Sequence, residues 1–201
     1  MSLPELETYR ALSIDERLGL GHALARRLGD DFQTTEELIG DFGLFVLHHV
    51  PTQRQLAFIP GGAFEMGLRD ADLDDLAELV DWTPEVDARI KAMRQLARPV
   101  RRVRVRPFLC DPALLRRRDL LRLTGDASAR ETIDREGALR VVASLGFRLP
   151  SEAELEYLAR GGGPFAFVDD GGRIWSETGR WPEAGPFGVS PWARSGAAER
   201  V

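Results

Sequence analysis

The residues of this chain that could support chemistry are one cysteine, three histidines and a group of carboxylates near residue 150. Cys110 is the only thiol among the 201 residues, so they hold neither a disulfide nor a cysteine-rich metal site. A nucleophilic or metal-bound cysteine needs its pKa lowered by a cation, a helix N-terminus or a metal. Asp111 favours the neutral thiol instead. We therefore expect Cys110 to be a buried or half-buried apolar residue with no catalytic role.

The histidines are poorly arranged for holding a metal ion. His48 and His49 are adjacent on an expected strand, where neighbouring side chains point to opposite faces. His22 belongs to a different expected element. A metal site built on them would need further ligands from acidic loops, and we predict no metal ligand among them.

The carboxylates lie in the segment 147–162, whose sequence is FRLPSEAELEYLARGG. Ser151 and Glu154 form a Ser-x-x-Glu capping box, which predicts a helix that ends at the glycines 161–162. Paired carboxylates can perform acid–base chemistry when burial separates their pKa values. Glu156 is four residues from both Glu152 and Arg160, which is the usual spacing of pairs on a helix surface. We interpret these charged residues as structural.

The elements that would position these residues follow from hydrophobic periodicity and turn chemistry. Residues 1–41 are expected to be helical, with capping boxes at Ser13–Glu16 and Thr34–Glu37. Residues 42–50 and 55–59 predict a hairpin, and residues 99–108 predict one strand with valines inward and arginines outward.

Helices and a tight turn complete this assignment. Helices are expected over 69–97, from Asp111 to Gly125, and from Asp134 to Gly146. The glycines 61–62, which follow Pro60, predict a turn with positive φ or a close approach of the backbone.

Composition and charge limit the classes of partner that we expect. The net charge is −5, and the only basic concentrations are the arginines at 98–106 and 116–118. Their strand alternates with valine rather than with stacking aromatics, so we predict no nucleic-acid partner and a solvated face paired with the acidic residues 70–87. No secretory signal and no apolar run of membrane-spanning length is present, so we expect a cytoplasmic protein without a membrane partner.

Aromatic residues are concentrated in the Gly- and Pro-rich C-terminal segment. Such residues are suitable anchors for a sugar, a peptide or a partner chain, and packing of a loop-rich core is the alternative explanation. The candidate ligand- or partner-binding residues are Trp175, Trp181, Phe187 and Trp192.

Several segments resemble the formylglycine-generating enzyme (sulfatase-modifying factor) family. Residues 147–162 resemble its R-L-P-[ST]-E-A-E-W-E-Y-A-A-R-G-G signature, and residues 58–67 resemble its F-I-P-G-G-x-F-x-M-G motif. The resemblance covers roughly residues 58–188 in the expected order of blocks. It implies an α+β, C-type-lectin-like fold with long loops over residues 42–201. Residues 1–41 would precede this domain, and 69–97 would be a helical insertion.

The chain departs from the family pattern after Phe187-Gly188. The family's G-N-V-W-E-W motif, and the cysteine pair that binds copper in its oxidase members, are not found in these residues. We therefore expect a non-catalytic binding or protein-interaction module without a cofactor. The partner would be a protein or a small ligand. Copper, iron or calcium would be expected as a cofactor only by analogy with the family.

Two alternatives remain open at this point. One is a metal-dependent oxidoreductase of the same family, of formylglycine-generating or sulfoxide-synthase type, whose active site is completed by other residues or by a partner chain. The other is a decayed gene, which predicts poor soluble expression.

Overall fold

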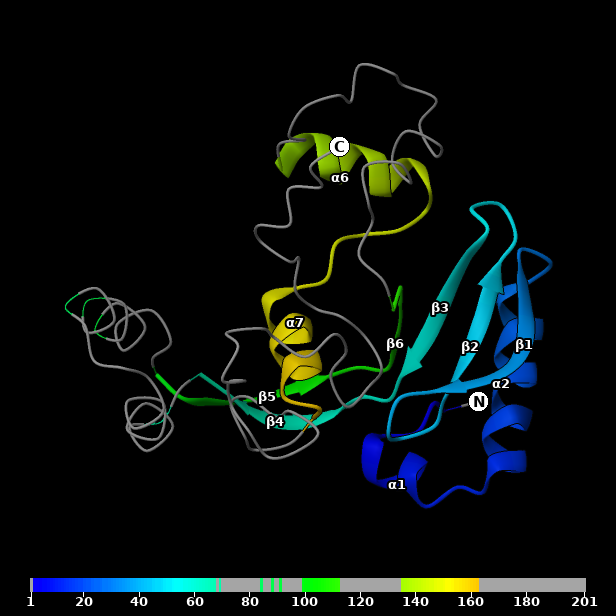
Figure 1. The fold of residues 1–201 in the computed structure, drawn as a ribbon, viewed down its shortest axis with the longest axis horizontal. Coiled ribbons are helices and arrows are strands. Elements are labelled where there is room, and N and C mark those ends of the chain that lie inside the picture. The colour runs from blue at the N-terminus through cyan, green and yellow to red at the C-terminus, as the bar shows by residue number, and fades with distance from the viewer. Residues whose placement is uncertain are drawn as a thin grey trace.

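The structure is a computed structural model with an α+β architecture of two antiparallel sheets and several helices (Figure 1). This confirms the expected class at its coarse level. The structure describes residues 2–67, 69, 84, 88, 91, 99–112 and 135–162. Its elements are α1 (Leu6–Arg10), α2 (Ile14–Leu28), β1 (Phe32–Ile39), β2 (Leu44–His49), β3 (Arg54–Ile59), β4 (Gly62–Met66), β5 (Arg101–Val105), β6 (Phe108–Cys110), α6 (Arg135–Ser144) and α7 (Glu152–Ala159).

The larger sheet has the strand order β1-β2-β3-β6, and every neighbouring pair is antiparallel. The predicted hairpin is confirmed as β2 and β3, with Leu47 opposite Leu56. β2 lies between β1 and β3 and is the most buried strand of this sheet, and α2 packs against β1 and β2. The Ser13–Glu16 capping box that begins α2 is also confirmed.

The expectation that residues 1–41 are helical throughout was wrong for β1. Gly29, with φ +98°, ends α2, and the chain then returns as a strand paired with β2. Thr34 and Glu37 form no capping box, and the Thr34 hydroxyl lies 3.1 Å from Nδ1 of His22 instead. Pairing with β2 satisfies the backbone of β1 and lets Phe32 pack against the core, which overrides the local helical pattern.

The single strand predicted over residues 99–108 is in fact two strands in different sheets. β5 pairs with β4, whereas β6 joins the larger sheet beside β3. Pro107 lies between them, and proline has no N–H to continue a ladder. A Cβ at Gly61 would lie 2.5 Å from the carbonyl oxygen of Val105, so the backbones do approach closely at this glycine.

The core joins the N-terminal helices to the larger sheet. Tyr9 of α1 is fully buried, and its ring lies 5.6 Å from that of Phe58, which stacks on Phe45 at 4.7 Å. The Tyr9 hydroxyl donates to the carbonyl of Gly43 and accepts from the amide of Phe45. α1 and α2 are therefore part of one core with the strands.

The two remaining helices, α6 and α7, agree with their predicted positions. α6 ends before Gly146, which has φ +78°, and α7 begins at the predicted Ser151–Glu154 capping box. Most of the predicted insertion over 69–97 and the predicted helix from Asp111 to Gly125 lie outside the described residues.

Candidate functional site

The two segments that carry the family resemblance meet at α7, which packs against β4 and β5. Tyr157 of α7 is fully buried, and its hydroxyl donates to the carbonyl of Pro60 at 3.1 Å. Its ring contacts that of Phe64 edge-on at 5.4 Å. Burial raises the pKa of the Tyr157 phenol, so it stays a neutral hydrogen-bond donor. We call β4, β5 and α7 together the α7 junction.

Glu156 of α7 and Arg160, the residue that caps the C-terminus of α7, bind the backbone of Gly67. The Gly67 amide donates to the carboxylate of Glu156 at 2.7 Å, and the guanidinium of Arg160 donates to the Gly67 carbonyl. Nε of Arg160 also donates to Glu156 at 2.8 Å, and Arg160 is only 3% exposed. Gly67 has φ +101°, which favours glycine. Both polar groups of one peptide residue are thus bound by side chains from 89 or more positions away.

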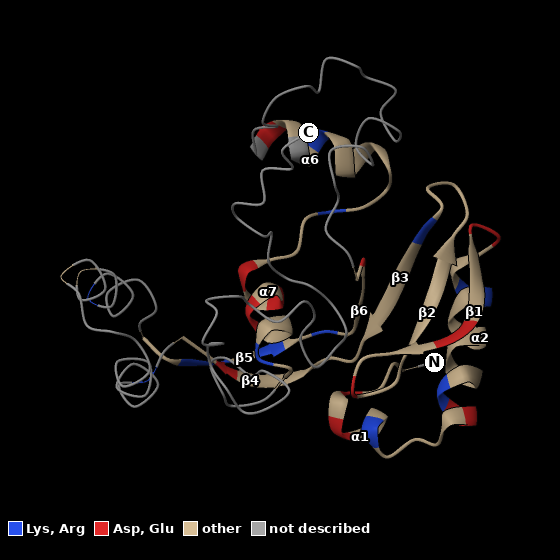
Figure 2. Cartoon of the chain, viewed as in Figure 1, with Lys and Arg blue, Asp and Glu red and all other residues tan. Residues whose placement is uncertain are grey.

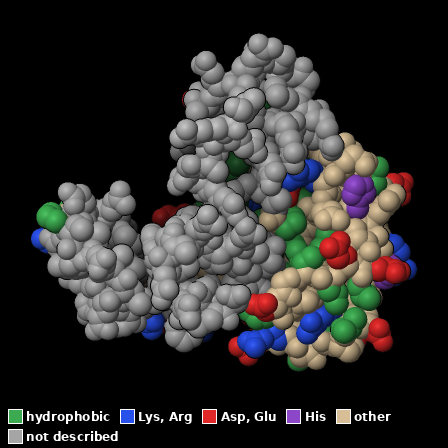
Figure 3. All heavy atoms as spheres, in the orientation of Figure 1, with side chains coloured by type: hydrophobic (Ala, Val, Ile, Leu, Met, Phe, Trp, Pro, Cys, Tyr) green, Lys and Arg blue, Asp and Glu red, His purple; other side chains and the backbone are tan. Residues whose placement is uncertain are grey.

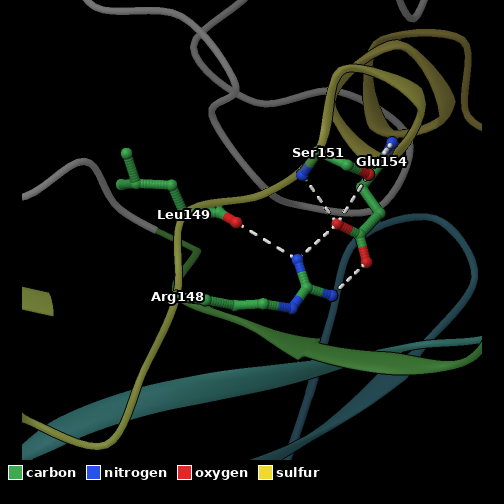
Figure 4. A network of polar contacts seen from close by, with 4 residues as sticks. All are labelled: Arg148, Leu149, Ser151 and Glu154. Carbon is green, nitrogen blue, oxygen red and sulfur yellow. Dashed lines mark hydrogen bonds and ion pairs between the residues drawn. The ribbon is translucent and has the colours of Figure 1, made fainter. Parts of the chain in front are cut away.

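The N-terminus of α7 carries a second polar network, shown in Figure 4. Arg148 binds both carboxylate oxygens of Glu154 at 2.7 and 2.5 Å. The amide and hydroxyl of Ser151 donate to the same carboxylate at 2.7 and 2.9 Å. The hydrogen bonds from Arg148, followed by those from Ser151, lower the pKa of Glu154 to about 2. Glu154 therefore stays ionised at neutral pH and acts as a cap and an ion-pair partner.

Cys110 is half-buried on β6 and is not activated. The pKa of its thiol is raised to about 12, mainly by burial and further by the negative charges of Asp111 and Glu154. Its Sγ donates to the Asp111 carbonyl at 3.4 Å. The thiol is therefore protonated at neutral pH, as the sequence predicted.

Of the three histidines, His49 is the most buried. His49 is 7% exposed, its Nδ1 lies 2.8 Å from the Thr52 hydroxyl, and its ring contacts Phe32 and Phe147 at 4.9 Å each. Burial, the largest cause, lowers the pKa of His49. Within the described ranges, no group of three or more His, Cys, Asp or Glu side chains is placed to hold a metal ion.

The predicted outward row of arginines on the strand after residue 99 is confirmed. Arg102, Arg104 and Arg106 are exposed, and Val105 is buried on the other side. The residues 70–87 that were predicted to pair with this face lie outside the described part of the chain, apart from Pro84. The four candidate binding residues Trp175, Trp181, Phe187 and Trp192 also lie outside it.

Sequence reasoning missed the contacts that join the two motifs. It interpreted Glu156 and Arg160 as a surface pair from their spacing, whereas Arg160 is buried against Gly67. It also gave no role to Tyr157, which contacts the 58–67 segment at Pro60. Spacing within a helix reports on neighbours along that helix only, so the two motifs themselves were the only available signal.

Comparison of the chain with known proteins identified no related protein. No protein-family model matches the chain, and neither the curated proteins nor the solved structures contain a significant match. The family resemblance therefore stays a prediction that depends on its motifs. Within the described residues, no helix has the length and apolar character needed to cross a bilayer.

Proposed function

We propose that this chain is a non-catalytic binding module built on the C-type-lectin-like scaffold of the formylglycine-generating enzyme family. The observation that carries the proposal is that four of the five charged residues of the signature make hydrogen bonds within the fold. Glu154 accepts from the amide of Ser151 at the start of α7 and pairs with Arg148, while Glu156 and Arg160 bind the backbone of Gly67. Through these contacts the signature segment joins α7 to the segment 60–67 of the scaffold.

The titration behaviour of the site supports the same proposal. Acid–base catalysis is most effective when the pKa of the group lies near the working pH. The pKa of Glu154 is about 2 and that of Cys110 is about 12, so neither group changes protonation near neutral pH. Because Cys110 is the only cysteine in the 201 residues, they cannot supply the cysteine pair that binds copper in the oxidase members.

The test is a search for metal-dependent turnover by the full chain. The purified protein would be loaded with Cu(I) or Fe(II), dialysed, and analysed for bound metal by mass spectrometry. It would then be incubated with oxygen, a thiol reductant and a cysteine-containing peptide, and the peptide would be examined for an aldehyde product. We expect no retained metal and no product above that of a Cys110→Ser control.

Stoichiometric retained metal with product formation would contradict the proposal and favour the oxidoreductase alternative. Loss of that product in Cys110→Ser would place the thiol in the reaction. A thermal unfolding scan on the same sample would show whether the protein assayed is cooperatively folded.

A further inference from the structure

The two faces of the β4–β5 sheet differ in character. α7 covers one face, where Phe64 contacts Tyr157 and Val105 is buried. On the other face, β5 and the residue after it place Arg102, Arg104 and Arg106 at alternate positions, and all three are exposed. Because alternate residues of a strand point to the same side, Arg102 and Arg104 lie on this face of β5, and the exposed Arg106, directly after the strand, continues their row. We call this row the arginine face.

The arginine face has more positive than negative charge. Glu5 forms a salt bridge with Arg104, and the exposed Glu65 lies opposite Arg102 in the ladder. In the part of the chain that the structure describes, the salt bridges include neither Arg102 nor Arg106. Figure 2 shows the basic positions along β5 beside the acidic position on β4.

This local excess of positive charge runs against the composition of the chain. The whole protein has 32 acidic and 27 basic residues, with a net charge of −5. Over the N-terminal region visible in Figure 3, acidic and basic side chains are intermixed. A row of three exposed arginines in an acidic protein is therefore a distinct surface with its own preference for ligands.

We propose that the arginine face binds an extended acidic segment of a partner protein, with Asp or Glu at alternate positions. This inference names the partner class of the binding module and rests on that proposed function. Alternate residues of a strand repeat at roughly 6.6 Å, and carboxylates of an extended peptide repeat at the same distance. A guanidinium group binds a carboxylate through two parallel hydrogen bonds, which gives each contact a defined geometry.

The chemistry of the row favours a peptide over a nucleic acid. Single-stranded nucleic acid binds where aromatic side chains stack on its bases between basic contacts. Val103 and Val105 alternate with the arginines here, and they face the opposite side of the sheet. Exposed ion pairs are individually weak and are screened by salt, so the complex must be salt-sensitive and depend on several arginines together.

The test uses fluorescence anisotropy with a labelled peptide of alternating Glu and Thr and the full 201-residue chain. A peptide of alternating Gln and Thr is the neutral control. The test variant is Arg102→Gln with Arg106→Gln. The matched variant, Arg26→Gln with Arg140→Gln, removes the same charge from exposed positions on α2 and α6. Circular dichroism would establish that both variants are folded.

We expect the acidic peptide to bind the unsubstituted chain and to weaken as salt is raised. Loss of two arginine contacts is expected to raise Kd about tenfold, whereas the matched variant changes it less than about twofold. Equal binding of the neutral peptide, an equal loss in the matched variant, or no binding at low salt would overturn the inference. Tighter binding of a single-stranded oligonucleotide through the same arginines would also overturn it.

The chain's own acidic segment is the remaining occupant to test. If the peptide binds only after Asp72, Asp74 and Asp75 are replaced by Asn, the arginine face is filled in cis and the inference fails. This assay contains no metal, so its outcome is independent of the turnover assay. Absence of peptide binding together with absence of turnover would refute the arginine-face inference and leave the binding-module proposal standing.

Discussion

Two regions of this protein share one apolar core but differ in the polar contacts that join their segments. In the N-terminal region, formed by α1, α2 and the larger sheet, aromatic and aliphatic side chains pack around Phe58. At the α7 junction, Phe64, Tyr157 and Leu158 belong to the same core, and charged and hydroxyl side chains in addition bind backbone groups of the segment 60–67. Apolar packing tolerates replacement by side chains of similar volume, whereas a polar contact requires a specific donor and acceptor.

This difference indicates which kind of substitution should destabilise each region. A change that removes volume should damage the N-terminal region most, and a change that removes charge at constant volume should damage the α7 junction most. The signature segment is thus expected to be sensitive to substitutions that a hydrophobic core would accept.

The largest expected effect tests the N-terminal region. Phe58 is fully buried between Tyr9 and Phe45, and Phe58→Ala leaves a cavity in that cluster. We expect a loss of about 3–5 kcal/mol in the free energy of unfolding, measured by urea titration with circular dichroism. Phe58→Leu is the control and should cost clearly less, because it retains most of the volume. Equal losses would show that packing does not dominate here.

The second prediction removes charge from the α7 junction while keeping apolar volume. Arg160→Met leaves the carbonyl of Gly67 without this donor and removes the cation beside Glu156. Breaking a buried ion pair costs about 3–5 kcal/mol, and we expect about 3 kcal/mol because the Glu156 side chain is 26% exposed.

The double variant Arg160→Met with Glu156→Gln is the control for this prediction. It should regain part of the loss, because it also removes the unpaired carboxylate. An unchanged urea midpoint in Arg160→Met would show that the junction does not depend on this pair.

The third prediction concerns the close approach at Gly62. A Cβ there would lie 2.8 Å from the hydroxyl oxygen of Tyr157, so Gly62→Ala is expected to cost about 1–3 kcal/mol. Tyr157→Phe removes that oxygen and leaves the Pro60 carbonyl without its donor, at a cost of about 1 kcal/mol. In thermal unfolding, the double variant should be more stable than the sum of the single losses. Simple additivity would contradict this contact.

The smallest effect is a dependence on pH at the α7 cap. The pKa of Glu154 is about 2 in the folded protein and 4.5 in the reference state, so its ionised form stabilises the fold. That contribution is complete above pH 4.5 and is lost as the pH falls towards 2. Glu154→Gln should therefore cost about 1 kcal/mol at neutral pH.

The measurement is the urea midpoint of both proteins across this range of pH. The difference between them should shrink below pH 4.5 and be nearly absent at pH 2. A difference that stays constant down to pH 2 would mean that the charge of Glu154 is unimportant.

Local sequence patterns correctly predicted those helices whose first turn is stabilised by contacts within that turn. The Ser13–Glu16 and Ser151–Glu154 boxes begin helices because each cap satisfies backbone groups within its own turn. Thr34 and Glu37 have the same spacing but lie in a strand, because pairing with β2 supplies stronger contacts than a cap would. The pattern alone cannot distinguish these cases.

The contacts of the site could not be predicted, because they join distant parts of the chain. Arg160 and Gly67 are 93 residues apart, and no periodicity connects them. The strand change at Pro107 did have a local signal, since proline interrupts a ladder. Its consequence, the transfer of β6 to the larger sheet, depends on β3 being available as a neighbour.

The contacts that fix the backbone of Gly67 also bear on which insertions the fold can accept. β4 ends at Met66 directly opposite Arg101 of β5, so the chain leaves and rejoins the small sheet at adjacent, fixed points. The entropic cost of closing a loop grows only with the logarithm of its length. Insertions or deletions between these two anchored ends are therefore expected to change the entropic cost of closure only slightly. We therefore expect the small sheet to accept inserted loops of different length between Met66 and Arg101.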